Sequence, residues 1–229
     1  MTDALQALRE DVAAASRRLA DAGLLVGTAG NVSARNVSAR GDGDDDVVAV
    51  TGTGVVLAGC TADDVTVVDR SGRVVAGRLA PTSELALHLG VYDDAATGHV
   101  GAVVHTHAPF ATAVACVLDE LPVLHYQQLA LGGEVRVASY ATFGTDELAA
   151  SVRTALAGRS AALMANHGSV AVGATLEKAV DNALLLEWLC QLHHRASALG
   201  TPRALTADQQ ADVIRVAIER DYGTTKENP

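Results

Sequence analysis

The sequence predicts a globular protein of mixed α/β structure, of the α+β class, and three observations support this fold class. The chain has 229 residues, 49% of them hydrophobic, which is enough to bury a substantial core in a single domain over residues 1–229. Segments with helical spacing of apolar residues are mixed with strand hairpins, and the two do not alternate strictly. No internal repeat and no interdomain linker divides the sequence.

Whole-chain composition excludes several classes of function. The formal net charge is -10 and the 17 basic residues form no stripe or run, which argues against a nucleic-acid partner. No apolar run reaches the roughly 18 residues of a membrane span, and the N-terminus lacks a secretory signal, so we expect a cytoplasmic protein with no membrane partner. The cysteines, Cys60, Cys116 and Cys190, have no paired spacing and are expected to be reduced core thiols.

Apolar periodicity, capping residues and turn signals predict the order of the elements. Helices are expected at 3–22, 81–92, 108–118, 145–158 and 175–199, and after residue 206. Strands are expected after the turn at 27–33, at 47–51, 65–68, 73–76, 103–107, 121–126 and 134–138, and on both sides of 166–168. The acidic turn at 41–46 is expected to be an exposed hairpin tip, because it lacks the later glutamate of a calcium loop.

Two histidines end the apolar, β-branched run at 103–107. Side chains two residues apart on a strand point to the same face, so His105 and His107 can share one metal ion. A second apolar run, at 161–165, leads to His167. Three imidazoles of this kind are the protein ligands of a catalytic zinc site.

A carboxylate is available to the same site. Glu84 is expected in the first turn of the helix at 81–92, where a glutamate often does no more than complement the helix dipole. Together with the three histidines it completes a catalytic-type zinc set, and it is also a candidate for proton transfer. His88 lies four residues later and could pair with Glu84 on a metal by itself, an alternative that we rank below the strand histidines.

Taken together, the motifs resemble the class II aldolase and adducin superfamily. They cover nearly the whole chain: GTAGNVS at 27–33, TG at 53–54, PTSE at 81–84, HTH at 105–107, HY at 125–126, YATFG at 140–144, NHG at 166–168 and YG at 222–223. The resemblance implies a central, largely antiparallel sheet flanked by helices. It also implies a homotetramer with active sites between subunits.

Within this superfamily the chain is most similar to ketose-1-phosphate aldolases of the L-fuculose 1-phosphate type. The resemblance implies Zn²⁺ or another divalent metal on His105, His107 and His167, with Glu84 completing the empty site and then serving as the acid/base. The implied lyase reaction reversibly cleaves a ketose 1-phosphate to dihydroxyacetone phosphate and a lactaldehyde-like aldehyde through a metal-stabilised enediolate. The partner is therefore expected to be a small sugar phosphate.

The same resemblance assigns further residues. Tyr126, reaching from a neighbouring subunit, would help take the proton from the C4 hydroxyl, Tyr222 would close over the site, and His125 would be structural. Hydroxyls, amides and a helix N-terminus can bind phosphate without Lys or Arg. The residues that match such a phosphate site are Thr28, Gly30, Asn31, Thr53, Gly54, Thr82 and Ser83.

Other reactions of the same superfamily stay open at this point. An L-ribulose-5-phosphate 4-epimerase resembles the aldolase in fold and metal, but typically has aspartate where this chain has Glu84. A methylthioribulose-1-phosphate dehydratase is compatible with the glutamate. An adducin-like interaction module would share the fold without the metal ligands, whereas all three histidines are present here.

Overall fold

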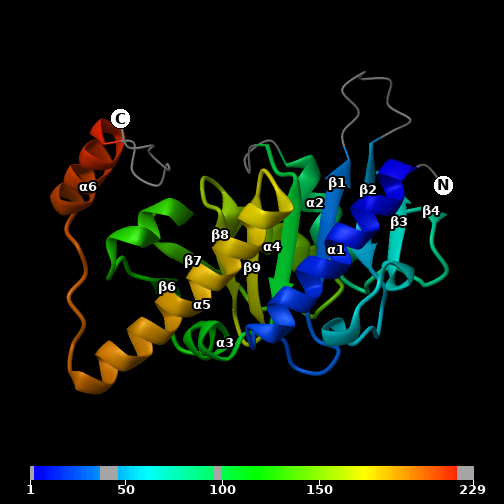
Figure 1. Cartoon of the computed structure of the whole chain (residues 1–229). Coiled ribbons are helices and arrows are strands. Elements are labelled where there is room, and N and C mark those ends of the chain that lie inside the picture. Colours follow the sequence, from blue (N-terminus) through cyan, green and yellow to red (C-terminus); the bar gives the residue numbers. More distant parts are fainter. Residues whose placement is uncertain (1–2, 37–45, 95–98, 221–229) are drawn as a thin grey trace.

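The computed structural model describes residues 3–36, 46–94 and 99–220, and a mixed sheet of nine strands runs through it (Figure 1). The strand order across the sheet is β4-β3-β2-β1-β5-β9-β8-β7-β6. The strands are β1 (Asn31–Asn36), β2 (Val47–Thr51), β3 (Val65–Asp69), β4 (Val74–Ala76), β5 (Ala102–Thr106), β6 (Glu120–Leu121), β7 (Val135–Ala138), β8 (Ala161–Met164) and β9 (Gly168–Gly173). Of the paired strands, β7 and β8 run parallel and the others antiparallel, which confirms the predicted largely antiparallel sheet.

Helices cover both faces of the sheet (Figure 1). They are α1 (Asp3–Asp21), α2 (Leu85–Asp93), α3 (Pro109–Ala115), α4 (Asp146–Leu156), α5 (Leu176–Leu199) and α6 (Ala207–Glu219), with short 3₁₀ helices η1 (Leu57–Gly59), η2 (Ala62–Asp64) and η4 (Tyr126–Leu131). The cap residues Thr145, Thr175 and Thr206 each accept a hydrogen bond from the backbone of the first helical turn, as their sequence positions predicted. In the described ranges, no helix combines the length and apolarity that crossing a bilayer requires.

Alternate residues of β5 enter different core layers. Val104 packs in the layer made with α1, α3 and α5, whereas Val103 packs in the layer made with α2 and α4. Because side chains two apart share a face, His105 points into the same layer as Val103, beneath α2. His105 therefore lies on the same side of the sheet as α2 and as Glu84, the residue before α2.

Three sequence predictions about elements are wrong. The helix expected at 81–92 begins only at Leu85, because the preceding segment is tied to the end of β2 by a bridge between Gly52 and Pro81, and Glu84 is therefore the residue before the helix. The strand expected at 121–126 ends at Leu121. Pro122 follows and has no N–H for a strand ladder. The helix expected to reach 118 ends at Ala115.

The cysteine prediction is correct only in part. All three cysteines are free, but Cys116 is exposed, whereas Cys60 and Cys190 are buried in the core. Cys116 follows the short helix α3 and so does not share its buried face. The acidic turn predicted at 41–46 lies outside the described residues, apart from Asp46.

Candidate functional site

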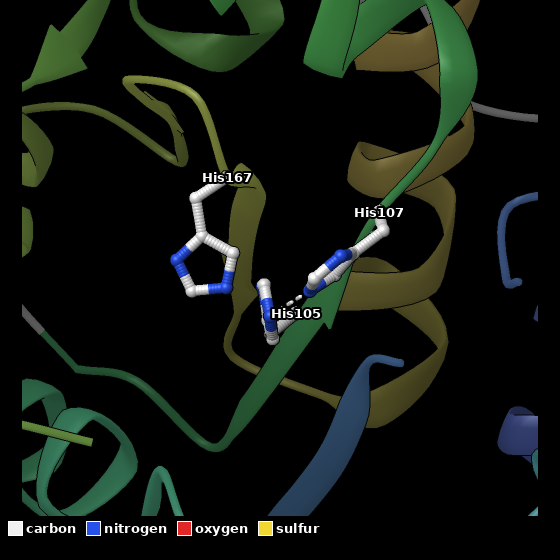
Figure 2. Close-up of side chains that lie close together, drawn as sticks. All are labelled: His105, His107 and His167. Carbon is white, nitrogen blue, oxygen red and sulfur yellow. Dashed lines mark hydrogen bonds between the residues drawn. The ribbon is translucent and has the colours of Figure 1, made fainter. Parts of the chain in front are cut away.

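Three histidine rings converge at the end of the sheet where β5 stops and β8 turns into β9 (Figure 2). The ring centroids of His105, His107 and His167 are 4.8–4.9 Å apart in each pair. One ligand nitrogen from each ring lies within 4.8 Å of the others. In a tetrahedral zinc site with Zn–N bonds of about 2.1 Å, neighbouring ligand atoms are roughly 3.4 Å apart. The cluster therefore has the dimensions of a single-ion site.

The hydrogen bond on the far side of His105 fixes which of its nitrogens faces the centre. Its Nδ1 is 2.9 Å from the carbonyl oxygen of Ser169, which can only accept, so Nδ1 carries a proton. Its Nε2 then faces His107 Nε2 at 3.0 Å and a carboxylate oxygen of Glu84 at 3.1 Å. A metal ion between these atoms would be bound by all of them at once.

Glu84 supplies an oxygen donor from the turn before α2. It is buried, and its Oε2 accepts a hydrogen bond of 2.9 Å from the amide of Asn31. Its Oε1 is 3.5 Å from His167 Nε2 and has no hydrogen-bond partner within the described ranges. Burial raises the pKa of Glu84, but the hydrogen bond and charge of His105, the Asn31 amide and the charge of His167 outweigh it and lower that pKa well below its usual range.

Two of the three histidines, His107 and His167, have a lowered pKa, which favours the unprotonated form that binds a metal. Burial, followed by the charge of His105, lowers the pKa of His107 to about 4 and shifts that of His167 in the same direction. Metal ligands have to be unprotonated, and near neutral pH these two imidazoles already are. Three imidazole nitrogens and one orphaned, buried carboxylate oxygen thus fit a divalent ion of the zinc type.

The cluster opens onto a cavity of about 290 Å³. Glu84, His107 and His167 line this cavity, whereas His105 is fully buried behind it. All the residues predicted for phosphate binding line the same cavity: Thr28, Gly30, Asn31, Thr53, Gly54, Thr82 and Ser83. They come from the loop before β1, the turn after β2 and the turn before α2. No Lys or Arg side chain is among the described residues that line it.

One glycine is required where the loop before β1 passes the metal centre. Gly30 has φ +95°, and a Cβ on it would lie 2.9 Å from the carbonyl oxygen of His105. The absence of a side chain therefore lets this loop lie directly against the end of β5. As a result, the predicted phosphate-binding residues and the histidines reach the same cavity.

Three cavity residues with aromatic or amide side chains were not assigned a role from the sequence. Tyr140 and Phe143 line the cavity although they are 66% and 64% exposed, which is unusual in a chain with 3% aromatic residues. Asn166 also lines it and has φ 55°, a left-handed conformation that asparagine tolerates. These residues belong to the motifs YATFG and NHG. The exposure of the two aromatic rings at the cavity, which would have marked them as binding residues, is visible only in the structure.

Of the two predicted tyrosines the structure describes only Tyr126, which does not line this cavity. Tyr126 lines a separate pocket against α6, together with Asp212, Val216 and Arg220 among others. Tyr222 lies outside the described residues. The ring of His125 packs on Tyr126 at 4.5 Å and on Trp188 at 5.0 Å, in agreement with a structural role.

The alternative metal pair of Glu84 and His88 is not formed. His88 is not one of the clustered histidines, and its Nδ1 is 2.7 Å from Ser33 Oγ and its Nε2 2.5 Å from Asn31 Oδ1. Both ring nitrogens are thus engaged by other side chains, and neither is available as a ligand.

Replacing Gly168 with alanine is expected to damage the histidine cluster. A Cβ at this position would lie 2.3 Å from the carbonyl oxygen of Thr106, so the start of β9 has to move away from β5, carrying His167 with it. Overpacking of this kind costs about 1–3 kcal/mol. Thermal unfolding and metal analysis should show lower stability and less bound metal, whereas Gly59→Ala, where a Cβ meets nothing within 4 Å, should show neither.

Comparison with known proteins identifies the family of this chain. The sequence model of the class II aldolase and adducin N-terminal domain matches residues 10–194. The Rhodospirillum rubrum protein named 5-methylthioribulose-1-phosphate/5-deoxyribulose-1-phosphate aldolase is 37% identical over 224 residues, 97% of this chain and 96% of that protein. The L-fuculose phosphate aldolase of Escherichia coli strain K12 is 36% identical over 193 residues, 84% of this chain and 85% of that protein. A solved structure of L-fuculose 1-phosphate aldolase is similar with a TM-score of 0.83 and 31% identity, covering 92% of this chain and 95% of that one. The chain belongs to the class II aldolase and adducin family, as its motifs predicted.

Proposed function

We propose that this chain is a metal-dependent aldolase that reversibly cleaves a ketose 1-phosphate to dihydroxyacetone phosphate and an aldehyde. The observation that carries the proposal is the position of Glu84, 3.1 Å from His105 Nε2 and on the wall of the cavity that the neutral phosphate-site residues line. Relatives named as aldolases of ketose 1-phosphates support the same reaction class.

The donor set supports a divalent cofactor, which we propose to be Zn²⁺ held by His105, His107 and His167, with Glu84 as the fourth ligand before substrate arrives. Such an ion acts as a Lewis acid on a carbonyl oxygen and stabilises developing negative charge. The residues of the chain then bind the substrate and move its protons.

The cavity residues have two proposed roles, which are to bind the phosphate group and to transfer protons. The hydroxyls of Thr28, Thr53 and Ser83 and nearby backbone amides are placed to donate hydrogen bonds to the phosphate group. A base removes the proton of the C4 hydroxyl, the C3–C4 bond breaks, and the C4 carbonyl of the aldehyde forms. C3 receives the electron pair of that bond, and Glu84 returns a proton to C3, which completes dihydroxyacetone phosphate.

The far end of the substrate is proposed to be apolar. L-Fuculose 1-phosphate, the substrate type expected from the sequence, yields lactaldehyde, and its terminal carbon is a methyl group. A 5-deoxyribulose or 5-methylthioribulose 1-phosphate is the second candidate, favoured by the relative that matches 97% of this chain. The exposed rings of Tyr140 and Phe143 at the cavity support both, since aromatic faces pack well on methyl and thioether groups.

A substrate panel tests this proposal. The metal-loaded protein would be incubated with L-fuculose 1-phosphate, 5-deoxyribulose 1-phosphate, 5-methylthioribulose 1-phosphate and L-ribulose 5-phosphate. Dihydroxyacetone phosphate would be followed by a coupled oxidation of NADH, and all products by mass spectrometry. We expect dihydroxyacetone phosphate from at least one ketose 1-phosphate. An epimer of the 5-phosphate, or a dehydrated diketone, without dihydroxyacetone phosphate would establish the epimerase or the dehydratase instead.

Tyr126 supports a shared site in a homotetramer. It is 40% exposed and lies outside the cavity of its own chain, so it would serve as the base for the C4 hydroxyl only from a neighbouring subunit. The adjacent helix α6 also exposes Ile214 and Ile218, at 49% and 73%. The role proposed for Tyr222, closing over the site, rests on the family resemblance alone, because this residue lies outside the described ranges.

Mixed oligomers test this arrangement. Inactive Tyr126→Phe and inactive His107→Ala subunits should regain activity when coexpressed, because some interfaces then combine an intact tyrosine with an intact metal site. Sizing would first establish that mixed oligomers form, and each parent would be assayed alone. No recovery in such oligomers, or a fully active monomer, would exclude the shared site.

The proposal also includes the cellular compartment, the domain organisation and the class of partner. All three cysteines are free, which suits a reducing compartment such as the cytoplasm. We take residues 1–229 as one domain whose partner is a sugar phosphate rather than a nucleic acid or a membrane.

A further inference from the structure

We infer that His88 is a positioning residue, which orients the side-chain amide of Asn31 and through it the carboxylate of Glu84. The inference rests on the proposed function, because it assigns His88 a role in the proton transfer performed by Glu84. His88 is fully buried on α2, one helical turn after Glu84, and it is not among the residues that cluster around the metal position.

A continuous chain of hydrogen bonds between buried side chains connects Tyr92 on α2 to the carboxylate of Glu84. The hydroxyls of Tyr92 and Ser33 are 2.7 Å apart, and Ser33 Oγ is 2.7 Å from His88 Nδ1. On the other side of the ring, His88 Nε2 is 2.5 Å from Asn31 Oδ1. The Nδ2 of Asn31 then donates to Glu84 Oε2 at 2.9 Å. Each of these side chains belongs to a residue that is at most 8% exposed.

The donor and acceptor groups of these side chains fix the direction of every hydrogen bond in the chain. An ionised carboxylate only accepts, so the NH₂ group of Asn31 has to face Glu84, and its carbonyl oxygen has to face His88. That oxygen only accepts, so Nε2 of His88 carries the proton. Burial, followed by the charge of His105, lowers the pKa of His88 to about 3, and the neutral ring has a bare Nδ1.

The hydrogen bonds at the Tyr92 end of the chain follow from the same assignment of donors and acceptors. The bare Nδ1 of His88 accepts the hydroxyl proton of Ser33, and Ser33 Oγ in turn accepts from Tyr92. Asn31 and Ser33 of β1, together with Tyr92 of α2, therefore hold His88 in one tautomer. A donor at Nε2 is what prevents the Asn31 amide from turning its oxygen toward Glu84.

Loss of the Nε2 donor of His88 should lower the rate of the chemical step. If the Asn31 amide turns over, its oxygen faces the carboxylate, repels it, and leaves Glu84 Oε2 without its hydrogen bond. Outer-shell partners of this kind typically contribute 10–100-fold in activity. We therefore expect His88→Met to lower kcat by about that factor, to change KM for the ketose 1-phosphate less than kcat, and to retain the bound metal.

A conservative variant and a control separate positioning from general destabilisation. The amide NH₂ of His88→Gln can occupy the place of Nε2 and donate to Asn31, so this variant should recover most of the kcat lost in His88→Met. Asn182→Leu is the control, because it removes a buried hydrogen bond of 2.8 Å from Asn182 to the carbonyl of Val172 on the far side of the sheet. Its kcat per folded protein should equal that of the wild type.

The tautomer can be measured without any assay of activity. In ¹⁵N-histidine-labelled protein, long-range ¹H–¹⁵N spectra should show a neutral imidazole with the proton on Nε2 that is assigned to His88 by its absence from His88→Gln. A His88 signal with the proton on Nδ1, or a His88→Met kcat equal to that of the wild type, would overturn the inference. If wild-type protein releases no dihydroxyacetone phosphate, the proposed function fails separately, and the spectra still decide the orientation. Should His88→Met fail to fold, low kcat in well-folded His88→Gln would count against the inference.

Discussion

Replacing Glu84 with glutamine is expected to lower kcat by about 10²–10⁴-fold, the usual contribution of a general acid or base. The amide keeps the shape of the side chain, and the three histidines that bind the metal are unchanged, so fold and metal content should be retained. The loss has a single physical cause, which is that an amide cannot return a proton to C3.

A partial reaction tests this assignment more narrowly than turnover does. The wild-type protein should exchange a C3 proton of dihydroxyacetone phosphate with solvent, which can be followed by NMR in D₂O without any aldehyde. Glu84→Gln should exchange it at a rate reduced in parallel with kcat. Exchange at the wild-type rate in this variant would remove Glu84 from the role of acid/base.

Replacing His107 with alanine is expected to abolish activity by a different route. The variant loses one of three imidazole ligands whose nitrogens lie within 4.8 Å of one another. Only two imidazoles would then hold the metal once Glu84 leaves it to act on the substrate, one fewer than the three protein ligands of a catalytic zinc site. Metal content and activity should therefore fall together. His99→Ala, which removes an exposed histidine outside the cluster, serves as the control and should retain both. Full activity in metal-free His107→Ala would contradict the assignment.

The convergence of the histidines was predictable from sequence only in part. The alternation of a strand is strict, so the His-x-His spacing alone placed His105 and His107 on one face. His167 required long-range pairing, because β9 joins β5 in the sheet and brings the β8–β9 turn beside the end of β5. That pairing was implied by the family resemblance and by no local pattern.

Other features depend on contacts that a local pattern does not contain. The late start of α2 results from the bridge between Gly52 and Pro81, which holds the turn before Leu85 against β2. The role of His88 was hidden for the same reason. Its spacing from Glu84 suggested a shared ligand site, whereas its ring nitrogens contact Ser33 and Asn31 on a different element. Helical spacing shows which residues share a face, but it does not show what lies opposite that face.

The non-enzymatic alternative, an adducin-like interaction module, makes a different prediction about the same residues. A protein that only binds partners has no need for a buried carboxylate oxygen without a hydrogen bond beside three imidazoles. Among the described residues the buried Oε1 of Glu84 has no hydrogen-bond partner, which is unfavourable unless a cation lies beside it. The arrangement thus favours a working metal centre over a remnant of one.

The central claim, that the histidine cluster holds the metal on which aldol cleavage depends, is tested most directly by a metal titration of activity. Protein stripped with a chelator and dialysed would be titrated with Zn²⁺ while dihydroxyacetone phosphate release and bound metal are measured on the same samples. We predict that activity rises in proportion to bound metal and reaches its plateau at about one ion per chain, the stoichiometry of a catalytic zinc site. Full activity in the stripped protein, with no metal bound, would contradict the account.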